Sequence, residues 1–257
     1  MCLVALAWKA HPEFPLVLST NRDEFFERPS APLHQWESGF YGGKDLRSGG
    51  TWMGFHPNGR WALLTNYRDF NNPRSARISR GKLVQAFLEN QMDPKSYLQA
   101  LVPNLHLYDG FNLLVSDGEK VFYLSNYAAG IQEIQPGIHG LSNALINDPW
   151  PKVELAKQQL REQLDASISQ NKLLHILKST DTYPLEILPQ TGVAPEMEIG
   201  LSAQLIRLGD NYGTVSAMAV TQNLEGFTQM KQRVFERDYH RFEDKQISFQ
   251  TLKNKHE

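Results

Sequence analysis

The stretch MCLVALAWKAHPEFPLVLSTNRDEFFERP, residues 1–29, decides the start of the fold. Residues 2–8 and 16–20 are short apolar runs rich in strand-forming side chains, and the KAHPEFP between them carries two prolines that favour a turn. The stretch therefore predicts a β-hairpin, whose second strand ends at the charged run NRDEFFERP, residues 21–29.

Further elements follow from the hydrophobic pattern. A polar, glycine-rich stretch comes after residue 29, and the apolar run in RWALLTN predicts a buried strand. Helical spacing predicts helices over 80–90, from an Asp93 cap onward, from Asp148–Pro149 to about Leu164, and over 171–178. Strands are predicted at 60–66, 111–116, 120–125, 212–221 and 227–235, with a loop at 183–200.

This order of elements segregates strands from helices. Strands, helices, strands, helices and strands follow one another without a linker or repeat, which is typical of a layered α+β fold rather than alternating βαβ units. We expect one domain over residues 1–257, since the length of 257 residues is within the range of large two-sheet folds.

Composition excludes several classes of function. A net charge of −2 and a single cysteine argue against nucleic-acid binding, an internal disulfide and a cysteine metal cluster. The amino terminus lacks a basic segment, and no apolar run reaches the length of a membrane span. We therefore expect a cytoplasmic protein without a metal site.

Cys2 is the sharpest chemical clue. If Met1 is removed, Cys2 carries both a thiol and an α-amine, and an amine with a pKa of roughly 7.7–8 can accept the thiol proton. Such a residue can attack an amide carbonyl, provided that nearby donors stabilise the oxyanion. The alternative is a small buried cysteine at the start of a strand.

Four polar residues are expected near Cys2. The end of the second hairpin strand returns close to the start of the first, which would bring Arg22 and Asp23 to the thiol. Asn66 and Asn143 carry neutral amide donors suited to an oxyanion hole. Each has an alternative role: Arg22 and Asp23 as a solvated strand-end cluster, and the asparagines as turn residues.

Together these segments resemble the NRDE family, proteins related to transport and Golgi organisation protein two. The resemblance covers nearly the whole chain, in the order of the family's motifs. The motifs here are the MC start, TNRDEFFERP (20–29), GGTWMGF (49–55), ALLTNYR (62–68), SRGKLVQAFL (79–88), YDGFNLLV (108–115), GLSNALINDPWPK (140–152) and YGTVSAMAV (212–220).

The resemblance implies a four-layer αββα sandwich of two stacked antiparallel sheets, similar to cysteine-type N-terminal-nucleophile hydrolases that cleave bile-salt conjugates and penicillin V. It implies Cys2 as nucleophile, Arg22 and Asp23 as the groups that orient and polarise it, and Asn66 and Asn143 as oxyanion or amine partners.

Two departures from these patterns stand out. In the hydrolases the arginine and aspartate are two residues apart, whereas Arg22 and Asp23 are adjacent, and adjacent strand residues face opposite sides. Many family members carry arginine where this chain has Val215, so its anchoring role is absent unless Arg207 or Arg233 supplies it.

The resemblance also implies haem trafficking, which leaves open whether the protein is an enzyme. A haem carrier would use the Cys2 thiolate or a histidine as axial ligand, and arginines of the 68–80 loop for the propionates. Candidate ligand contacts are Asn21, Arg68, Arg77 and Arg80. The alternatives are a cysteine amidase that hydrolyses a small N-acyl amide without a cofactor, and a protein that binds acyl-coenzyme A or lipid.

Overall fold

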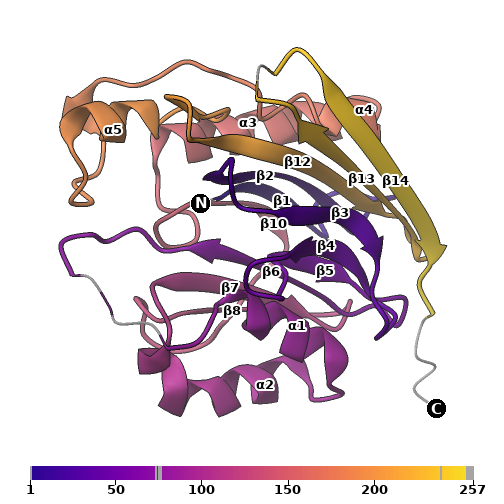
Figure 1. The fold of residues 1–257 in the computed structure, drawn as a ribbon. Helices are drawn as coiled ribbons and strands as arrows, with labels where there is room; N and C mark the ends of the chain where they lie inside the picture. Colours follow the sequence, from indigo (N-terminus) through magenta and orange to yellow (C-terminus); the bar gives the residue numbers. More distant parts are fainter. Residues whose placement is uncertain (1, 73, 75–76, 238, 253–257) are drawn as a thin grey trace.

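Two antiparallel sheets stack face to face, and helices cover the outer face of each (Figure 1). The structure is a computed structural model that describes residues 2–72, 74, 77–237 and 239–252, with the backbone alone at Cys2. The four-layer αββα arrangement and the α+β class expected from the sequence are confirmed.

The first sheet has the strand order β10-β1-β2-β12-β13-β14, and β11 also pairs with β12. The amino-terminal hairpin β1–β2 therefore lies inside the sheet, between β10 and β12. The strands are β1 (Cys2–Trp8), β2 (Leu16–Phe25), β10 (Gly137–Leu141), β11 (Arg207–Leu208), β12 (Tyr212–Gln222), β13 (Phe227–Phe235) and β14 (Phe242–Gln250).

The second sheet is a meander in which neighbours in sequence are neighbours in space, in the order β3 to β9. Such pairing needs only short connections, apart from the segment between β6 and β7 that carries helices. The strands are β3 (Ser30–Gln35), β4 (Tyr41–Asp45), β5 (Met53–Phe55), β6 (Trp61–Asn66), β7 (Phe111–Ser116), β8 (Val121–Ser125) and β9 (Gln132–Glu133).

Alternation along β1 shows why its apolar run is continuous. Val4, Leu6 and Trp8 enter the core between the sheets, and the residues between them pack under the helices. A strand buried on both faces needs apolar side chains at every position. Each such side chain contributes roughly 1.5–3 kcal/mol by burial.

Helices close the two outer faces. Helices α1 (Gly81–Glu89) and α2 (Pro94–Leu101) pack on the second sheet, and α3 (Pro151–Leu164) and α4 (Gln170–Leu173) pack on the first. The remaining helical segments are η1 (Val102–Leu107), η2 (Leu185–Ile187) and α5 (Pro195–Gly200). Among the described helices, none combines the length and apolar character that crossing a bilayer requires.

The second hairpin strand is longer than predicted. β2 continues to Phe25, because its residues beyond Thr20 pair with β12 from Ala217 back to Tyr212. The charged run that follows Thr20 therefore begins inside the sheet. The pattern did not predict this part of the strand because its residues are polar. The strand with which it pairs, β12, also lies almost 200 residues away in the sequence.

The glycine-rich stretch forms three strands that the hydrophobic pattern did not reveal. β3, β4 and β5 occupy it, and a Cβ added at Gly42 would meet the Met53 carbonyl oxygen at 2.6 Å. Glycine is required there for close backbone approach, and it removes the side chain that would have marked the strand.

Three helical predictions need correction. α3 begins at Pro151, because the Asp148 carboxylate accepts from the Leu145 amide at 2.9 Å instead of starting a helix at Asp148–Pro149. The helix predicted over 171–178 is α4, a single turn, and α5 lies in the expected 183–200 loop. Strands β10 and β14 had not been predicted.

Candidate active site and ligand-binding clefts

The backbone of Cys2 pairs with that of Arg22. In the β1–β2 register Cys2 lies opposite Arg22, and on the other side of β2 Arg22 lies opposite Ser216 of β12. The hairpin therefore brings the amino-terminal end of β1 to the position that the sequence predicted. The side chain of Cys2 lies outside the described residues.

A small cavity of about 100 Å³ lies beside this pair. We call it the inner cavity. Three of the predicted catalytic residues, Arg22, Asp23 and Asn66, line it together with the predicted ligand contact Arg80. The other lining residues are Glu24, Arg28, Asp45, Thr51, Trp52, Leu64, Ser79 and Gly81.

Arg22 is buried with little compensation for its charge. Its side chain is 7% exposed, and its guanidinium lies 4.4 Å from the ring centre of Trp52. The nearest carboxylate oxygen, on Glu24, is 3.7 Å away, and no hydrogen bond joins the guanidinium to any described residue. A guanidinium without hydrogen bonds to the protein can donate to a molecule in the cavity that it lines.

Asp23 is held on the helix-covered side of β2. Its carboxylate accepts a hydrogen bond of 2.7 Å from Thr214, and burial raises the pKa of the carboxyl group, although the nearby charges of Lys152 and Arg22 act in the opposite direction. Lys152 belongs to α3. Arg22 and Asp23 thus direct their charges to opposite faces of β2, as expected for adjacent strand residues.

The two predicted asparagines are joined directly. The Asn143 side-chain amide donates to the backbone carbonyl of Asn66 at 2.9 Å, and the Arg68 amide donates to the Asn143 carbonyl at 2.8 Å. Asn66 lines the inner cavity, whereas Asn143 does not. Asn143 therefore positions the end of β6, and the Asn66 side chain is the one that borders the cavity.

An open cleft of about 470 Å³ adjoins the inner cavity and shares Glu24, Arg28, Asn66 and Arg80 with it. We call it the arginine cleft, because five arginines line it against three carboxylates. The charged lining residues are Arg28, Arg47, Arg68, Arg74, Arg80, Glu24, Asp69 and Asp109. Its field favours an anionic ligand.

Aromatic rings form part of the same cleft. Tyr67 and Tyr127 stack with ring centres 3.9 Å apart, and the Arg74 guanidinium lies 4.4 Å from the Tyr127 centre. Phe25, Phe70 and Tyr212 also line the cleft. A flat, partly apolar molecule with acidic groups could stack on the aromatic rings and pair its acidic groups with the arginines of this cleft.

The arginines of the cleft differ in the ion pairs and hydrogen bonds that they form with the rest of the protein. Arg68 is buried and forms an ion pair with Glu198 of α5, and it stacks over Trp150 at 4.9 Å. Arg80 donates to the Gly110 carbonyl at 2.8 Å. Arg47 and Arg74 form no ion pair within the described part of the chain, and Arg74 donates one hydrogen bond to the Asn126 carbonyl at 3.2 Å. Both charges therefore remain available to an anionic ligand.

Two predicted ligand contacts lie away from these cavities. The Asn21 amide donates to the carbonyls of Leu177 and Gln204 at 2.8 and 2.9 Å, so it fastens β2 to the segments covering the first sheet. Arg77 is exposed, and its backbone amide bonds to Leu107. Neither lines the inner cavity or the arginine cleft.

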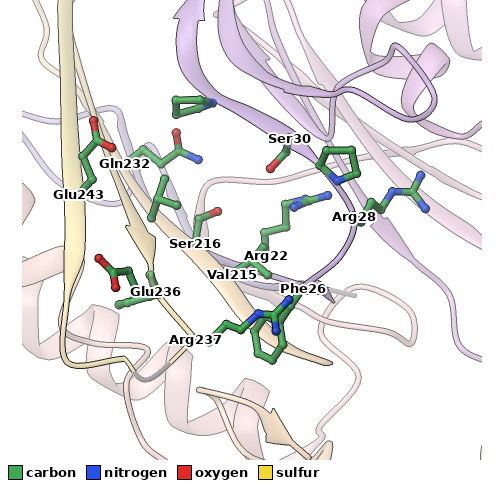
Figure 2. A pocket seen from close by; sticks show the side chains of 14 residues that line it. Arg22, Phe26, Arg28, Ser30, Val215, Ser216, Gln232, Glu236, Arg237 and Glu243 are labelled. Atoms are coloured by element: carbon green, nitrogen blue, oxygen red, sulfur yellow. The ribbon is translucent and has the colours of Figure 1, made fainter. Parts of the chain in front are cut away.

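A third cavity, of about 680 Å³, lies on the other side of Arg22, between β3 and the strands β12 to β14. We call it the side pocket; Figure 2 shows Arg22, Val215, Ser216 and Gln232 around it. The remaining lining residues are Phe26, Arg28, Pro29, Ser30, Pro32, Val234, Phe235, Glu236, Arg237 and Glu243.

Arg207 and Arg233 were the two candidates to replace the arginine that many family members carry at the position of Val215. Neither of them lines the side pocket. Arg233 forms a two-pronged pair with Asp244 at 2.7 and 2.8 Å, and Arg207 stacks over Tyr239 at 4.2 Å. Arg237 does line the pocket, beside Phe26 (Figure 2). Ser216 and Gln232 had not been predicted as site residues, although Ser216 lies within the YGTVSAMAV motif.

The histidines of the described residues lie away from these sites, since none of them lines the inner cavity, the arginine cleft or the side pocket. Across the described residues, no group of three or more His, Cys, Asp or Glu side chains could hold a metal ion.

Comparison with solved structures gives distant likenesses. A Caenorhabditis elegans N-acylethanolamine-hydrolyzing acid amidase ortholog aligns over 85% of this chain and 92% of its own, at 12% identity and a TM-score of 0.46. A C2A mutant of conjugated bile acid hydrolase from Clostridium perfringens aligns over 98% of both chains, at 9% identity and a TM-score of 0.41.

Sequence comparison is far more specific. A Bos taurus Transport and Golgi organization protein 2 homolog is 32% identical over 91% of this chain and 92% of its own. A Mus musculus homolog is 37% identical over 65% of this chain and 66% of its own. The family model for Transport and Golgi organisation 2 matches residues 1–241. This chain therefore belongs to the Transport and Golgi organisation 2 family.

Proposed function

We propose that the protein carries haem in the arginine cleft. The observation behind this proposal is that one cleft of about 470 Å³ combines stacked tyrosine rings with an excess of arginine. Haem is a flat, largely apolar molecule with two propionates, and guanidinium groups are strong partners for carboxylates. Arg47 and Arg74 would meet the propionates, and Tyr67 and Tyr127 would contact the ring.

A carrier must also release its cargo. No histidine among the residues that the structure describes lines the cleft, so binding would rest on the propionates and on ring contacts rather than on a histidine–iron bond. Exposed charge pairs contribute only about 0–1 kcal/mol each, which is compatible with exchange. The proposed role is therefore transient binding and transfer of haem.

A haem titration of the purified protein, followed at the Soret band, tests this role. Wild type should saturate at micromolar haem, and a double variant, Arg47→Gln with Arg74→Gln, should bind about 5- to 20-fold more weakly. Arg161→Gln, an exposed arginine on α3, is the matched control and should bind as wild type does. A flat wild-type titration would exclude the proposal. Palmitoyl-coenzyme A as competitor would reveal whether an acyl thioester uses the same cleft.

A cysteine amidase is the second candidate, and the pairing of Cys2 with Arg22 beside the inner cavity favours it. With Met1 removed, the α-amine would take the thiol proton, and the thiolate would add to an amide carbonyl. Collapse, with the proton returned from the α-ammonium to the amide nitrogen, would expel the neutral amine and leave a thioester, which water would hydrolyse to the free acid and the Cys2 thiol. Asn66, which lines the inner cavity, would donate to the oxyanion.

Intact mass and turnover separate this candidate from haem carriage. An amidase is expected to lack Met1 in its intact mass and to hydrolyse N-acyl p-nitroanilides. The Cys2→Ala variant should lose the hydrolysis. Protein that retains Met1 in its native host lacks the free α-amine, and that result would exclude this mechanism. Haem binding would be unaffected by it, because the arginine cleft does not require the amine.

A further inference from the structure

The side pocket contains a cation whose hydrogen-bonding capacity is unused. Arg22 is 7% exposed, its nearest carboxylate oxygen is 3.7 Å away, and no described residue accepts a hydrogen bond from its guanidinium. A largely buried cation is most stable when acceptors satisfy its donors. A ligand in the pocket that supplies an anionic acceptor would satisfy them.

Two neutral donors line the same pocket. Ser216, opposite Arg22 in the sheet, is 5% exposed, and its hydroxyl has no hydrogen bond to any described residue. Gln232, on the next strand, is 2% exposed, and its carbonyl oxygen accepts from the Leu33 amide at 2.5 Å. That bond fixes the side chain and leaves its NH₂ group as a donor to the pocket.

Figure 2 shows these three side chains around one hollow. They come from three neighbouring strands, β2, β12 and β13, so the sheet itself holds their spacing. A site built on strands is more rigid than one on loops. The arrangement is therefore a preformed set of donors converging on one anionic group.

The remaining walls decide what kind of anion fits. Phe26, Pro29, Val215 and Val234 give the pocket apolar surface, which suits a hydrocarbon portion of the ligand. Arg28 and Arg237 add positive charge, and Glu236 and Glu243 add negative charge at the far side from Arg22 (Figure 2). Three arginines against two glutamates leave a small positive excess, which suits a monoanion better than a dianion such as a phosphate monoester.

We propose that the side pocket binds a monocarboxylic acid with an apolar body, its carboxylate held by Arg22, Ser216 and Gln232. Charge-assisted hydrogen bonds from Arg22 provide most of the affinity, and the other two donors fix the orientation. This site shares only Arg28 with the arginine cleft and does not depend on haem. Since Cys2 pairs with Arg22, it would also lie where an acid product could rest if the amidase mechanism holds.

Titration with octanoate, followed by amide chemical shifts in a nitrogen-15 NMR spectrum, tests the proposal. The shifts should locate to Ser216, Gln232 and their strand neighbours. Methyl octanoate and octyl phosphate serve as the uncharged and dianionic analogues. The variants are Arg22→Gln, Ser216→Ala and Val215→Trp, with Arg161→Gln as the control.

Arg22→Gln should weaken octanoate binding about 10- to 100-fold, and Ser216→Ala about 3- to 10-fold. Val215→Trp should abolish binding by filling the pocket, which checks the location without removing a donor. Methyl octanoate and octyl phosphate should bind at least tenfold more weakly than octanoate. Equal affinity of octanoate for wild type and Arg22→Gln would overturn the proposal, as would shifts confined to the arginine cleft. A failed haem titration would leave this result unchanged.

Discussion

Arg22 and Asp23 are neighbours in the sequence, yet each serves a different side of the first sheet. Arg22 stacks on Trp52 between the sheets. Asp23 accepts a hydrogen bond from Thr214, and the positive charge of Lys152 in α3 acts to lower its pKa. The strand that separates them is part of the site. The charge of each residue can therefore be tested separately.

Replacing Asp23 by asparagine should stabilise the protein more at high pH than at low pH. Burial raises the pKa of Asp23 above its unfolded value near 3.9, so the folded state holds the extra proton. The stability contributed by the protonated form is complete below pH of about 4 and is lost as the pH rises through the folded pKa. Asparagine is neutral throughout and avoids that loss.

Urea unfolding of wild type and Asp23→Asn at pH 4 and pH 8 measures this difference. The free energy of unfolding of the variant relative to wild type should increase by about 1.4 kcal/mol for each unit by which folding raises the pKa. An equal difference at the two pH values would contradict the role assigned to burial.

Arg22→Met should leave the free energy of unfolding unchanged or raise it by about 1–2 kcal/mol. The variant loses the contact with Trp52, worth about 0.5–2 kcal/mol, but it removes the larger cost of a buried charge without hydrogen bonds. Urea unfolding checks the value. A loss of more than 2 kcal/mol would mean that Arg22 holds the fold together rather than awaiting a ligand.

The buried pair of Arg68 and Glu198 should be fragile when broken on one side. Glu198→Gln or Arg68→Met should each cost about 3–5 kcal/mol, because a charge is left without its partner inside the protein. The double change Arg68→Met with Glu198→Leu should cost less than the sum of the single changes.

Chemical denaturation of all three variants provides the measurement. The exposed pair of Arg241 and Glu236, 3.2 Å apart, offers a matched control in which Arg241→Gln should cost no more than about 1 kcal/mol. Additive costs at Arg68 and Glu198 would show that the two charges are not coupled.

Gly43→Ala should disturb the ring that supports Arg22. A Cβ at Gly43 would lie 2.4 Å from Trp52 Cη2, so the indole must shift. Overpacking of this kind costs about 1–3 kcal/mol. Octanoate should also bind less tightly, because the guanidinium loses its support. Wild-type stability together with wild-type affinity would show that Trp52 has room to move.

The sequence predicted the layers of this fold better than their edges. Continuous apolar runs identified β1 and β6, and helical spacing identified α1 and α2. In each case burial in the core requires apolar side chains at a regular spacing, which is visible in the sequence. The strands β3 to β5 were not predicted, because their glycines allow close backbone contacts and carry no side chains that would show a strand pattern.

The candidate site also divides into residues that local sequence predicts and residues that depend on long-range strand pairing. A hairpin predicts by its own geometry that Arg22 lies beside Cys2, and the register agrees. Ser216 and Gln232 belong to the site only because β12 and β13 pair onto β2 from far along the chain. Local patterns contain no information about such pairing, so these donors could not be predicted.

The register shift between Thr214 and Ser216 has a consequence for insertions and deletions. In a regular strand these two residues would face the same side, yet Thr214 bonds to Asp23 on one face and Ser216 lies opposite Arg22 on the other. Val215 is the extra residue that reverses the alternation. Deletion of this single codon would remove the bulge and make Thr214 and Ser216 adjacent, opposite the adjacent residues Asp23 and Arg22, so both partnerships would persist. A one-residue insertion or deletion elsewhere in β12 would instead move the residues beyond it to the other face. Substitutions at residue 215 keep the phase, so side-chain size at this position can diverge among relatives while both partnerships persist.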